Sequence, residues 1–243
     1  CNNASFNPDY CREVEGITRQ LEEGIRFFDA KYQGQKYLAY FQAYSNTYAS
    51  LEVLKSRYEE ALAHPKVVGL VIATRPDAVN EEILDYIAGL SKHCYVCMEY
   101  GVESVNERVL ETIHRRHSYR EAEWAICATA ERGIYVGAHL IFGLPGETKE
   151  SMLEGAVRLG NLPLHVLKLH QLQIIKDTVM AEEYARNPEK FQLYSVYDYL
   201  DFVVEVIGKL CPEVYLERFV NQSPPEYLIC LLYTSPSPRD TER

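Results

Sequence analysis

Three polar side chains stand at or near the ends of apolar, strand-like runs, where they could act on a ligand: Glu103, His139 and Gln173. A carboxylate, an imidazole and an amide are strong hydrogen-bonding groups, and the first two can also move a proton. His139 is the one polar residue in the run 134–142, which ends at Gly143. Glycine tolerates positive φ and lets a ligand approach the backbone closely, so a flat ligand can meet this strand end.

A basic cluster at residues 114–117 offers a different chemistry, the recognition of anions. Arg115 within it can grip a carboxylate or a phosphate through a bidentate fork, although such a cluster more often marks a solvated helix end. The sequence contains no P-loop, no nucleophile elbow, no zinc-binding H-E-x-x-H and no dinucleotide-binding G-x-G-x-x-G. The common signatures for phosphate, acyl and hydride transfer are therefore missing.

The seven cysteines do not predict a disulfide framework, because their number is odd and their spacing irregular. We therefore expect a reducing, cytoplasmic location. Cys94 and Cys97 have the spacing of a metal-binding pair, but residues i and i+3 of a strand point to opposite faces of the sheet. We expect both thiols, and Cys127 in its predicted helix, to be buried packing residues.

The composition permits a full hydrophobic core and excludes several classes of protein. The 243 residues are 47% hydrophobic, enough for one large domain or two small ones. The net charge of −10 argues against a large non-specific nucleic-acid footprint. No apolar run is long enough to cross a membrane, and no signal peptide opens the chain.

The elements that must position these side chains alternate between strand and helix, with strand starts roughly 30 to 40 residues apart. Strands are predicted at 36–43, 67–73, 94–99, 134–142 and 165–174, and a short β-like run at 214–220. Helices are predicted at 15–28, 50–63, 80–90, 148–159 and 195–210, with two more opened by capping boxes at Ser104 and Ser118. This pattern predicts an α/β enzyme with a parallel sheet, whose post-strand loops converge on one mouth.

Five segments on these joints resemble the radical S-adenosylmethionine (SAM) superfamily. They are CNNASF at the amino terminus, TRPD at 74–77, EYGVESVNERVLETIHRRH at 99–117, HLIFGLPGET at 139–148 and KLHQLQIIKDT at 168–178. The resemblance is to the YhcC-type branch, which is related to the Elongator catalytic subunit and to oxygen-independent coproporphyrinogen oxidases. It covers the chain from Cys1 to about Cys230. Five motifs in the right order are specific, although each is weak alone.

The resemblance implies a fold, a cofactor set and a reaction. The fold is a partial (βα)6 TIM-like barrel of parallel strands, whose first strand lies upstream of this chain. The cofactors are a [4Fe–4S] cluster, for which Cys1 matches the last cysteine of the binding motif, and SAM at the fourth iron site. Reductive cleavage of SAM then yields methionine and a 5′-deoxyadenosyl radical that abstracts hydrogen from an unknown substrate. An electron donor such as flavodoxin or ferredoxin is the implied partner; no membrane is, and tRNA is disfavoured without being excluded.

The family motifs also imply roles for individual residues. Glu103 matches a position that bonds the ribose hydroxyls, Arg115 one that grips the methionyl carboxylate, and His139 one where relatives often carry a ribose-binding acid. Gly143 is expected to pass close to the cofactor, and Gln173 to offer backbone contacts to the adenine. The loop with Tyr44, Ser45 and Thr47 stands where relatives carry a glycine-rich segment that binds the methionyl amino group. Arg116 replaces a glycine usual in the branch, and Ala73 a glutamate of Elongator-type relatives.

Expectations for the organisation of the chain follow from the same resemblance. Residues 1–212 are expected to form the radical SAM core, 213–230 to begin a C-terminal extension, and 231–243 to be a non-native tail. With one cluster cysteine, this chain alone is expected to assemble no proper cluster and to be inactive.

Two alternative functions stay open from the residues. One is a cluster-independent α/β-barrel lyase or aldolase, in which Arg115 binds the phosphate of its substrate. The other is a non-enzymatic RNA-binding or scaffold protein, which the negative charge disfavours.

Overall fold

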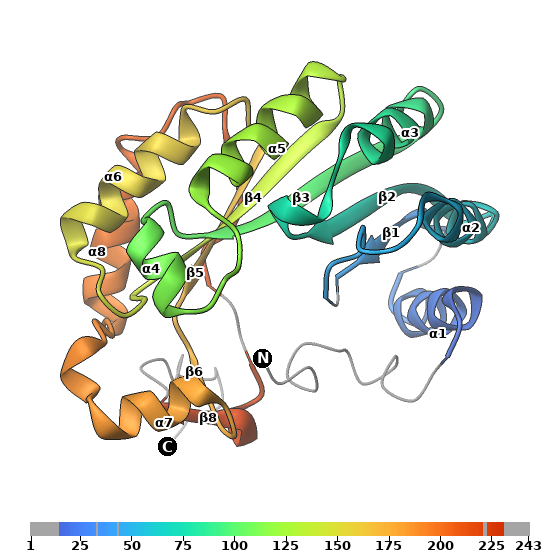
Figure 1. Ribbon diagram of the computed structural model, residues 1–243. Coiled ribbons are helices and arrows are strands. Elements are labelled where there is room, and N and C mark those ends of the chain that lie inside the picture. Colours follow the sequence, from blue (N-terminus) through green and yellow to red (C-terminus); the bar gives the residue numbers. More distant parts are fainter. Residues whose placement is uncertain (1–14, 33, 43, 221–222, 231–243) are drawn as a thin grey trace.

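The computed structural model describes residues 15–32, 34–42, 44–220 and 223–230 (Figure 1). Six parallel strands form one curled sheet in the order β1-β2-β3-β4-β5-β7. The strands are β1 (Tyr37–Phe41), β2 (Val67–Thr74), β3 (Tyr95–Glu103), β4 (Tyr135–Phe142), β5 (Val166–Gln171) and β7 (Tyr215–Arg218). The prediction of a partial, TIM-like barrel with parallel strands is confirmed.

Most of the helices lie along the outer side of this arc, whereas the helix at 179–186 lies beside the strand at 174–175, away from the main sheet (Figure 1). The helices are α1 (Ile17–Asp29), α2 (Leu51–Leu62), α3 (Glu81–Ser91), α4 (Glu107–Thr112), α5 (Tyr119–Glu131), α6 (Lys149–Gly160), α7 (Val179–Arg186) and α8 (Val196–Ile207). A small antiparallel ribbon of β6 (Ile174–Ile175) and β8 (Leu228–Cys230) stands apart from the main sheet. Parallel strands need long crossovers, and the helices supply them.

The two faces of the sheet have opposite chemistry. Alternate strand residues that point toward the helices are apolar and buried, as in the series Val96, Met98, Tyr100 and Val102 of β3. Each fully buried side chain of this kind stabilises the fold by roughly 1.5–3 kcal/mol. The inward-pointing residues include Glu99 and Lys168, so the concave face is where polar groups gather.

Two predicted elements differ from the structure in informative ways. Strand β3 continues past Glu99 to Glu103, because Tyr100 and Val102 prolong the alternation of buried residues. Glu103 is therefore the last strand residue rather than a loop residue. The run predicted only as β-like at 214–220 contains β7, the sixth strand of the main sheet, which pairs with β5.

The helix starts follow the predicted caps with one exception. Asn80 caps α3, Ser118 and Glu121 form a complete capping box on α5, and Ser195 caps α8. The predicted box at Ser104 is wrong, since α4 begins later and Asn106 is its N-cap. The Ser104 hydroxyl instead accepts a hydrogen bond from the Asn106 amide (3.1 Å) and donates one to Glu147.

Gly69 and Gly89 offer a matched test of this packing. A Cβ on Gly69 of β2 would lie 2.3 Å from the Tyr95 carbonyl oxygen of the neighbouring strand, whereas a Cβ on Gly89 of α3 would meet nothing within 4 Å. We expect Gly69→Ala to destabilise the fold by about 3 kcal/mol through overpacking. Gly89→Ala should stabilise it by up to about 1 kcal/mol through helix propensity. Urea unfolding measures both, and equal effects of the two substitutions would contradict the register of β2 on β3.

Candidate functional site

The carboxyl end of β3 carries an ion pair between two residues predicted to bind the cofactor. The Arg115 Nη2 atom lies 2.9 Å from Glu103 Oε1 and donates to the Gly101 carbonyl oxygen at 2.7 Å. Both side chains are largely covered, with relative exposures of 24% for Arg115 and 15% for Glu103. A covered ion pair with an additional backbone contact is more strongly held than an exposed one.

His117 completes this group, although it had no predicted role. The Arg115 Nε atom donates to His117 Nε2 at 3.2 Å, and the imidazole is buried. Burial and the Arg115 charge lower the pKa of His117, which keeps its ring neutral and able to accept from the arginine. His117 therefore helps to fix the orientation of the guanidinium that pairs with Glu103.

The backbone around this group is strained. Glu103 has φ 67°, and Arg115 lies between two further left-handed residues, His114 at 55° and Arg116 at 60°. Side chains other than glycine rarely adopt this conformation, and it costs of order 1 kcal/mol or more at each position. A glycine in place of Arg116, as the resemblance implies for relatives, would suit its backbone. Gly101 is required for another reason, because a Cβ there would lie 2.3 Å from Arg115 Nη2.

Deeper on the concave face, a buried ion pair joins β3 to β5. The Lys168 Nζ atom donates to Glu99 Oε1 at 2.6 Å, and both side chains are at most 3% exposed. His139 Nε2 lies 3.1 Å from Glu99 Oε2, and the Tyr40 hydroxyl donates to the same oxygen at 2.7 Å. Burial alone would raise the pKa of Glu99, but contacts with His139 and Lys168 outweigh it and lower the pKa to about 2.

Two further groups border this network. Glu217 of β7 lies 3.0 Å from Lys168 Nζ, so the lysine is shared between two carboxylates. The His170 ring lies 5.4 Å from that of His139, and burial followed by the charge of His139 lowers the pKa of His170 to about 3. His139 thus belongs to this network rather than to the Glu103–Arg115 pair.

A third polar contact lies behind Glu103. Glu147, which precedes α6, accepts the hydrogen bond from Ser104 and lines a small cavity together with Glu103, Leu140 and Met152. Its Oε2 atom is buried and has no hydrogen-bond partner among the described residues. Burial raises the pKa of Glu147 to about 7, and the hydrogen bond from Ser104 offsets only part of that effect.

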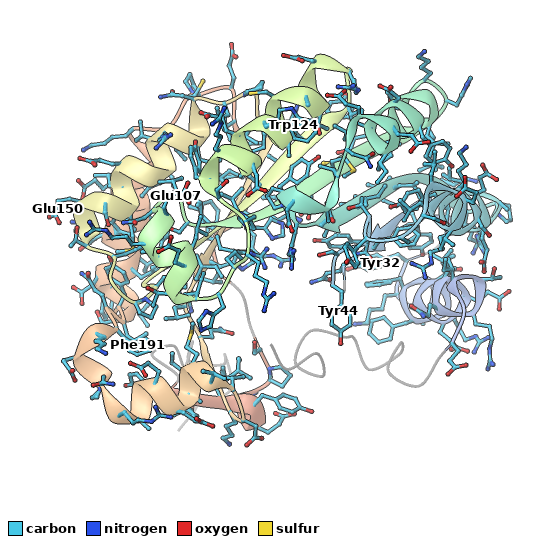
Figure 2. All side chains as sticks on the ribbon, in the orientation of Figure 1. Tyr32, Tyr44, Glu107, Trp124, Glu150 and Phe191 are labelled. Atoms are coloured by element: carbon cyan, nitrogen blue, oxygen red, sulfur yellow. The ribbon has the colours of Figure 1, made fainter. Side chains whose placement is uncertain are left out.

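The loop after β1 holds three more of the predicted residues. Tyr44 is 80% exposed with φ 63°, and Figure 2 shows it projecting away from the strands. Ser45 is half-buried. Thr47 is buried, and its hydroxyl donates to the Ala78 carbonyl oxygen and pairs with Thr74 Oγ1, both at 2.6 Å. The Thr47 hydroxyl therefore joins this loop to the loop after β2.

Gly143 and Gln173 follow β4 and β5 at the same end of the sheet. Gly143 has φ 93°, and a Cβ there would lie 2.7 Å from the Gln192 carbonyl oxygen and 3.6 Å from Leu172 Cβ. Leu172 donates its amide to the Phe142 carbonyl oxygen at 2.8 Å, which brings the two strand ends together. Gln173 is half-buried beside them. The structure thus brings together the Glu103–Arg115 pair and, on adjacent strand ends, Gly143 and Gln173.

The described residues contain no group of three or more His, Cys, Asp or Glu side chains that could hold a metal ion. Cys1, the predicted cluster ligand, lies outside them. Cys97 is buried, and burial raises its thiol pKa to about 12, as expected of a packing residue. Cys94 and Cys127, also expected to be buried, are only half-buried. No helix within the described part of the chain has the length and apolar character needed to cross a membrane.

Sequence reasoning missed Glu99, Lys168, His117 and Glu147. A signal for the first two was present, because opposite charges fall inside apolar, strand-like runs of the same chain. Buried charges are rare unless they are paired, so each of these residues required a partner.

Comparison with known proteins places this chain in a family. The model of the radical SAM superfamily matches residues 1–156, and that of the radical SAM C-terminal domain matches residues 164–242. The chain therefore belongs to the radical SAM superfamily and is an enzyme of the radical SAM class. Enzymes of this class use a [4Fe–4S] cluster and SAM as cofactors, and they require a reductant for the cluster.

Similar proteins indicate the branch of the radical SAM superfamily to which the chain belongs. The chain is 35% identical to YtqA of Bacillus subtilis over 229 residues, which cover 94% of this chain and 70% of that protein. It is 32% identical to YhcC of Escherichia coli, covering 90% and 69% respectively. The solved structure of archaeal Methanocaldococcus infernus Elp3 superposes with a TM-score of 0.75 at 16% identity, covering 88% of this chain and 54% of that one. The predicted YhcC-type branch is confirmed.

Because the Glu99–Lys168 pair is buried, we expect that removing one partner will strongly destabilise the fold. Lys168→Met leaves the Glu99 carboxylate buried without its main partner, and we expect a loss of about 3–5 kcal/mol in the free energy of unfolding. The pKa of Glu99 falls from 4.5 unfolded to about 2 folded, so its contribution is present above about pH 4.5 and is lost as the pH falls toward 2. Urea unfolding from about pH 7 to about pH 3 measures both effects. Exposed Lys92→Met is the matched control, and an equal loss there would contradict the assignment.

The buried Glu147 carboxyl predicts the opposite pH dependence. Its pKa rises from 4.5 unfolded to about 7 folded, so its favourable contribution is complete below about pH 4.5 and is lost as the pH rises through 7. We expect Glu147→Gln to be more stable than the parent at about pH 8, by up to roughly 3 kcal/mol, and equal to it near pH 4.5. Exposed Glu154→Gln on α6, the helix that follows Glu147, is the control. A stability difference that does not vary with pH would refute this behaviour.

Proposed function

We propose that Glu103 and Arg115 bind SAM at the carboxyl ends of the strands, and that the full-length protein cleaves it reductively to start radical chemistry on a substrate. The observation that carries this proposal is the 2.9 Å Glu103–Arg115 pair on strained backbone at the rim of a parallel sheet. Ligands of α/β folds bind at this end of the strands. Family membership supports the same cofactor.

The two side chains suit the two polar ends of SAM. A carboxylate can accept hydrogen bonds from both vicinal ribose hydroxyls, which fits Glu103. The guanidinium of Arg115 is a permanent cation that can donate to a carboxylate, which fits the methionyl end. Within the described residues, Arg115 Nη1 makes no hydrogen bond or ion pair, so the arginine keeps donors for a ligand while Glu103, Gly101 and His117 orient it.

The remaining predicted residues support binding in different ways. Gly143 and Gln173 would present backbone to the adenine, where positive φ at Gly143 turns the chain away from the sheet. Ser45 offers a hydroxyl for the methionyl amino group, while Thr47 positions that loop through its contacts with Thr74 and Ala78. His139 would present its remaining exposed edge toward the ribose while Glu99 orients its ring.

The iron–sulfur cluster would be held in part by Cys1. When bound and reduced by a donor such as flavodoxin or ferredoxin, it supplies the electron that splits SAM into methionine and a 5′-deoxyadenosyl radical. The protein's own residues bind SAM, orient it and exclude water from the reacting atoms.

A phosphate ligand for Arg115 fits the geometry less well. A phosphate bound to the guanidinium would lie beside the Glu103 carboxylate, which is 2.9 Å from the same nitrogen. A phosphate there would bring up to two negative charges beside Glu103, whereas the methionyl carboxylate of SAM brings one, which the ammonium and sulfonium groups of the same molecule offset. The SAM zwitterion with its ribose gives each protein group a complementary partner.

Substitutions at the rim test this function. In the full-length protein purified without oxygen, we expect reductive formation of 5′-deoxyadenosine from SAM. Arg115→Lys loses the planar fork and should raise KM for SAM by about tenfold or more, as should Glu103→Gln through its weaker hydrogen bonds to the ribose. Exposed Arg120→Lys on α5 should leave KM unchanged. If the parent protein yields no 5′-deoxyadenosine, or if Arg115→Lys has the parent's KM, the proposal fails.

A further inference from the structure

The turn that carries Glu103 is anchored from behind by a contact between two site loops. Ser104 follows β3 and Glu147 follows β4, 43 residues later, and the Ser104 hydroxyl donates to Glu147 Oε1. The same hydroxyl accepts from the Asn106 amide at 3.1 Å. Ser104 therefore has both a donor and an acceptor role, and neither is the helix cap that its sequence context suggested.

This anchor holds a conformation that the chain would otherwise avoid. The Ser104 amide donates to the Val102 carbonyl oxygen at 2.9 Å, which closes a tight turn around Glu103 at φ 67°. A left-handed glutamate persists only where its surroundings fix it. Arg115 fixes its side chain, and Ser104 with Glu147 fixes the following residue.

The Glu147 carboxyl group has only one of its two oxygens hydrogen-bonded to a described residue. Its Oε2 atom is buried and lacks a hydrogen-bond partner among the described residues, and so does the hydroxyl of nearby Tyr194. The titratable groups near it are Glu103, which lines the same cavity, and Tyr194 from the segment before α8. None of these groups is a cation, so an ionised Glu147 would have no opposite charge beside it.

We propose that Glu147 is a positioning residue whose protonation, relayed through Ser104, sets the Glu103 turn and thereby the affinity of the site for the ribose of SAM. The inference rests on the proposed role of Glu103. The neutral carboxyl can stay buried and accept from Ser104 through Oε1. Ionisation leaves a charged oxygen without a donor, so the side chain gains by moving toward water and away from Ser104.

The raised pKa of Glu147, about 7, agrees with this geometry and places the change near neutrality. The bond to Ser104 is expected to form below that pH and to weaken above it. A hydrogen bond of this kind changes an equilibrium by about five- to tenfold, which sets the size of the expected effect.

The first experiment needs no ligand. Hydrogen–deuterium exchange of the amides at 102–106 is compared between this chain and Glu147→Gln, which keeps the acceptor and removes the charge, at about pH 6 and about pH 8. Comparing the two proteins at the same pH cancels the intrinsic pH dependence of exchange. We expect equal protection at the lower pH and several-fold faster exchange in the parent at the higher one. Ser104→Ala should exchange fast at both, and exposed Glu154→Gln should match the parent. Equal exchange of parent and Glu147→Gln at both pH values overturns the proposal.

The second experiment measures SAM dissociation constants for the full-length protein with its cluster, by equilibrium dialysis over the same pH range. We expect the constant of the parent to rise about five- to tenfold between the two pH values, and that of Glu147→Gln to stay level. Parallel pH dependence in both proteins overturns the positioning role. If neither protein binds SAM while the exchange result holds, the proposed function fails but the link between Glu147 and the Glu103 turn stands.

Discussion

The buried Glu99–Lys168 ion pair is the contact on which the arrangement of the curled sheet depends. Helices and apolar side chains cover the outer face of the strands, while the inner face of a partial barrel must carry groups that a polar ligand can approach. Lys168 and Glu99 meet across β4, and Tyr40, His139 and Glu217 extend the contacts to five of the six strands. A charge at this depth is tolerated only when fully paired, so each member fixes the others.

This network separates the concave face into two levels. The deep level is filled by side chains that satisfy one another, and Lys168 has both of its carboxylate partners within 3.0 Å. The rim, at Glu103 and Arg115, keeps accessible edges and unused donors. His139 stands between the two levels, because its ring is oriented by Glu99 while part of it remains exposed. A ligand bound at the rim would therefore lie above the paired charges of Glu99, Lys168 and Glu217, which the fold positions before any ligand binds.

Local sequence patterns predicted the parts of this design that depend on neighbouring residues. Alternating apolar residues located the strands, and Asn80, Ser118 and Ser195 located helix starts. The features that the sequence did not predict depend on contacts between residues far apart in the chain. Ser104 has the spacing of a capping box, yet tertiary contact with Glu147, 43 residues away, gives its hydroxyl another partner. The Glu99–Lys168 pair spans 69 residues and depends on the register of three strands, which no local pattern specifies. The roles proposed for Glu103 and Arg115 rest on family motifs, whereas the contact between these two side chains is visible only in the fold.

The distribution of strained backbone distinguishes the rim, where the proposed SAM-binding residues lie, from the deep network of Glu99 and Lys168. Three of the five described residues other than glycine with positive φ follow a strand or lie at its carboxyl end, namely Tyr44, Glu103 and Asp177, and the other two, His114 and Arg116, flank the arginine that pairs with Glu103. The deep network needs no such strain, since its side chains project from regular strands. Strain of this kind destabilises the fold and persists only where other contacts fix it. At Glu103 those contacts are an arginine on one side and a serine–glutamate bond on the other. The conformation of the rim thus depends on an ion pair and on a hydrogen bond to a buried carboxyl group, and we propose that the charge of that group alters it. The deep network depends instead on a buried ion pair whose partners keep each other charged.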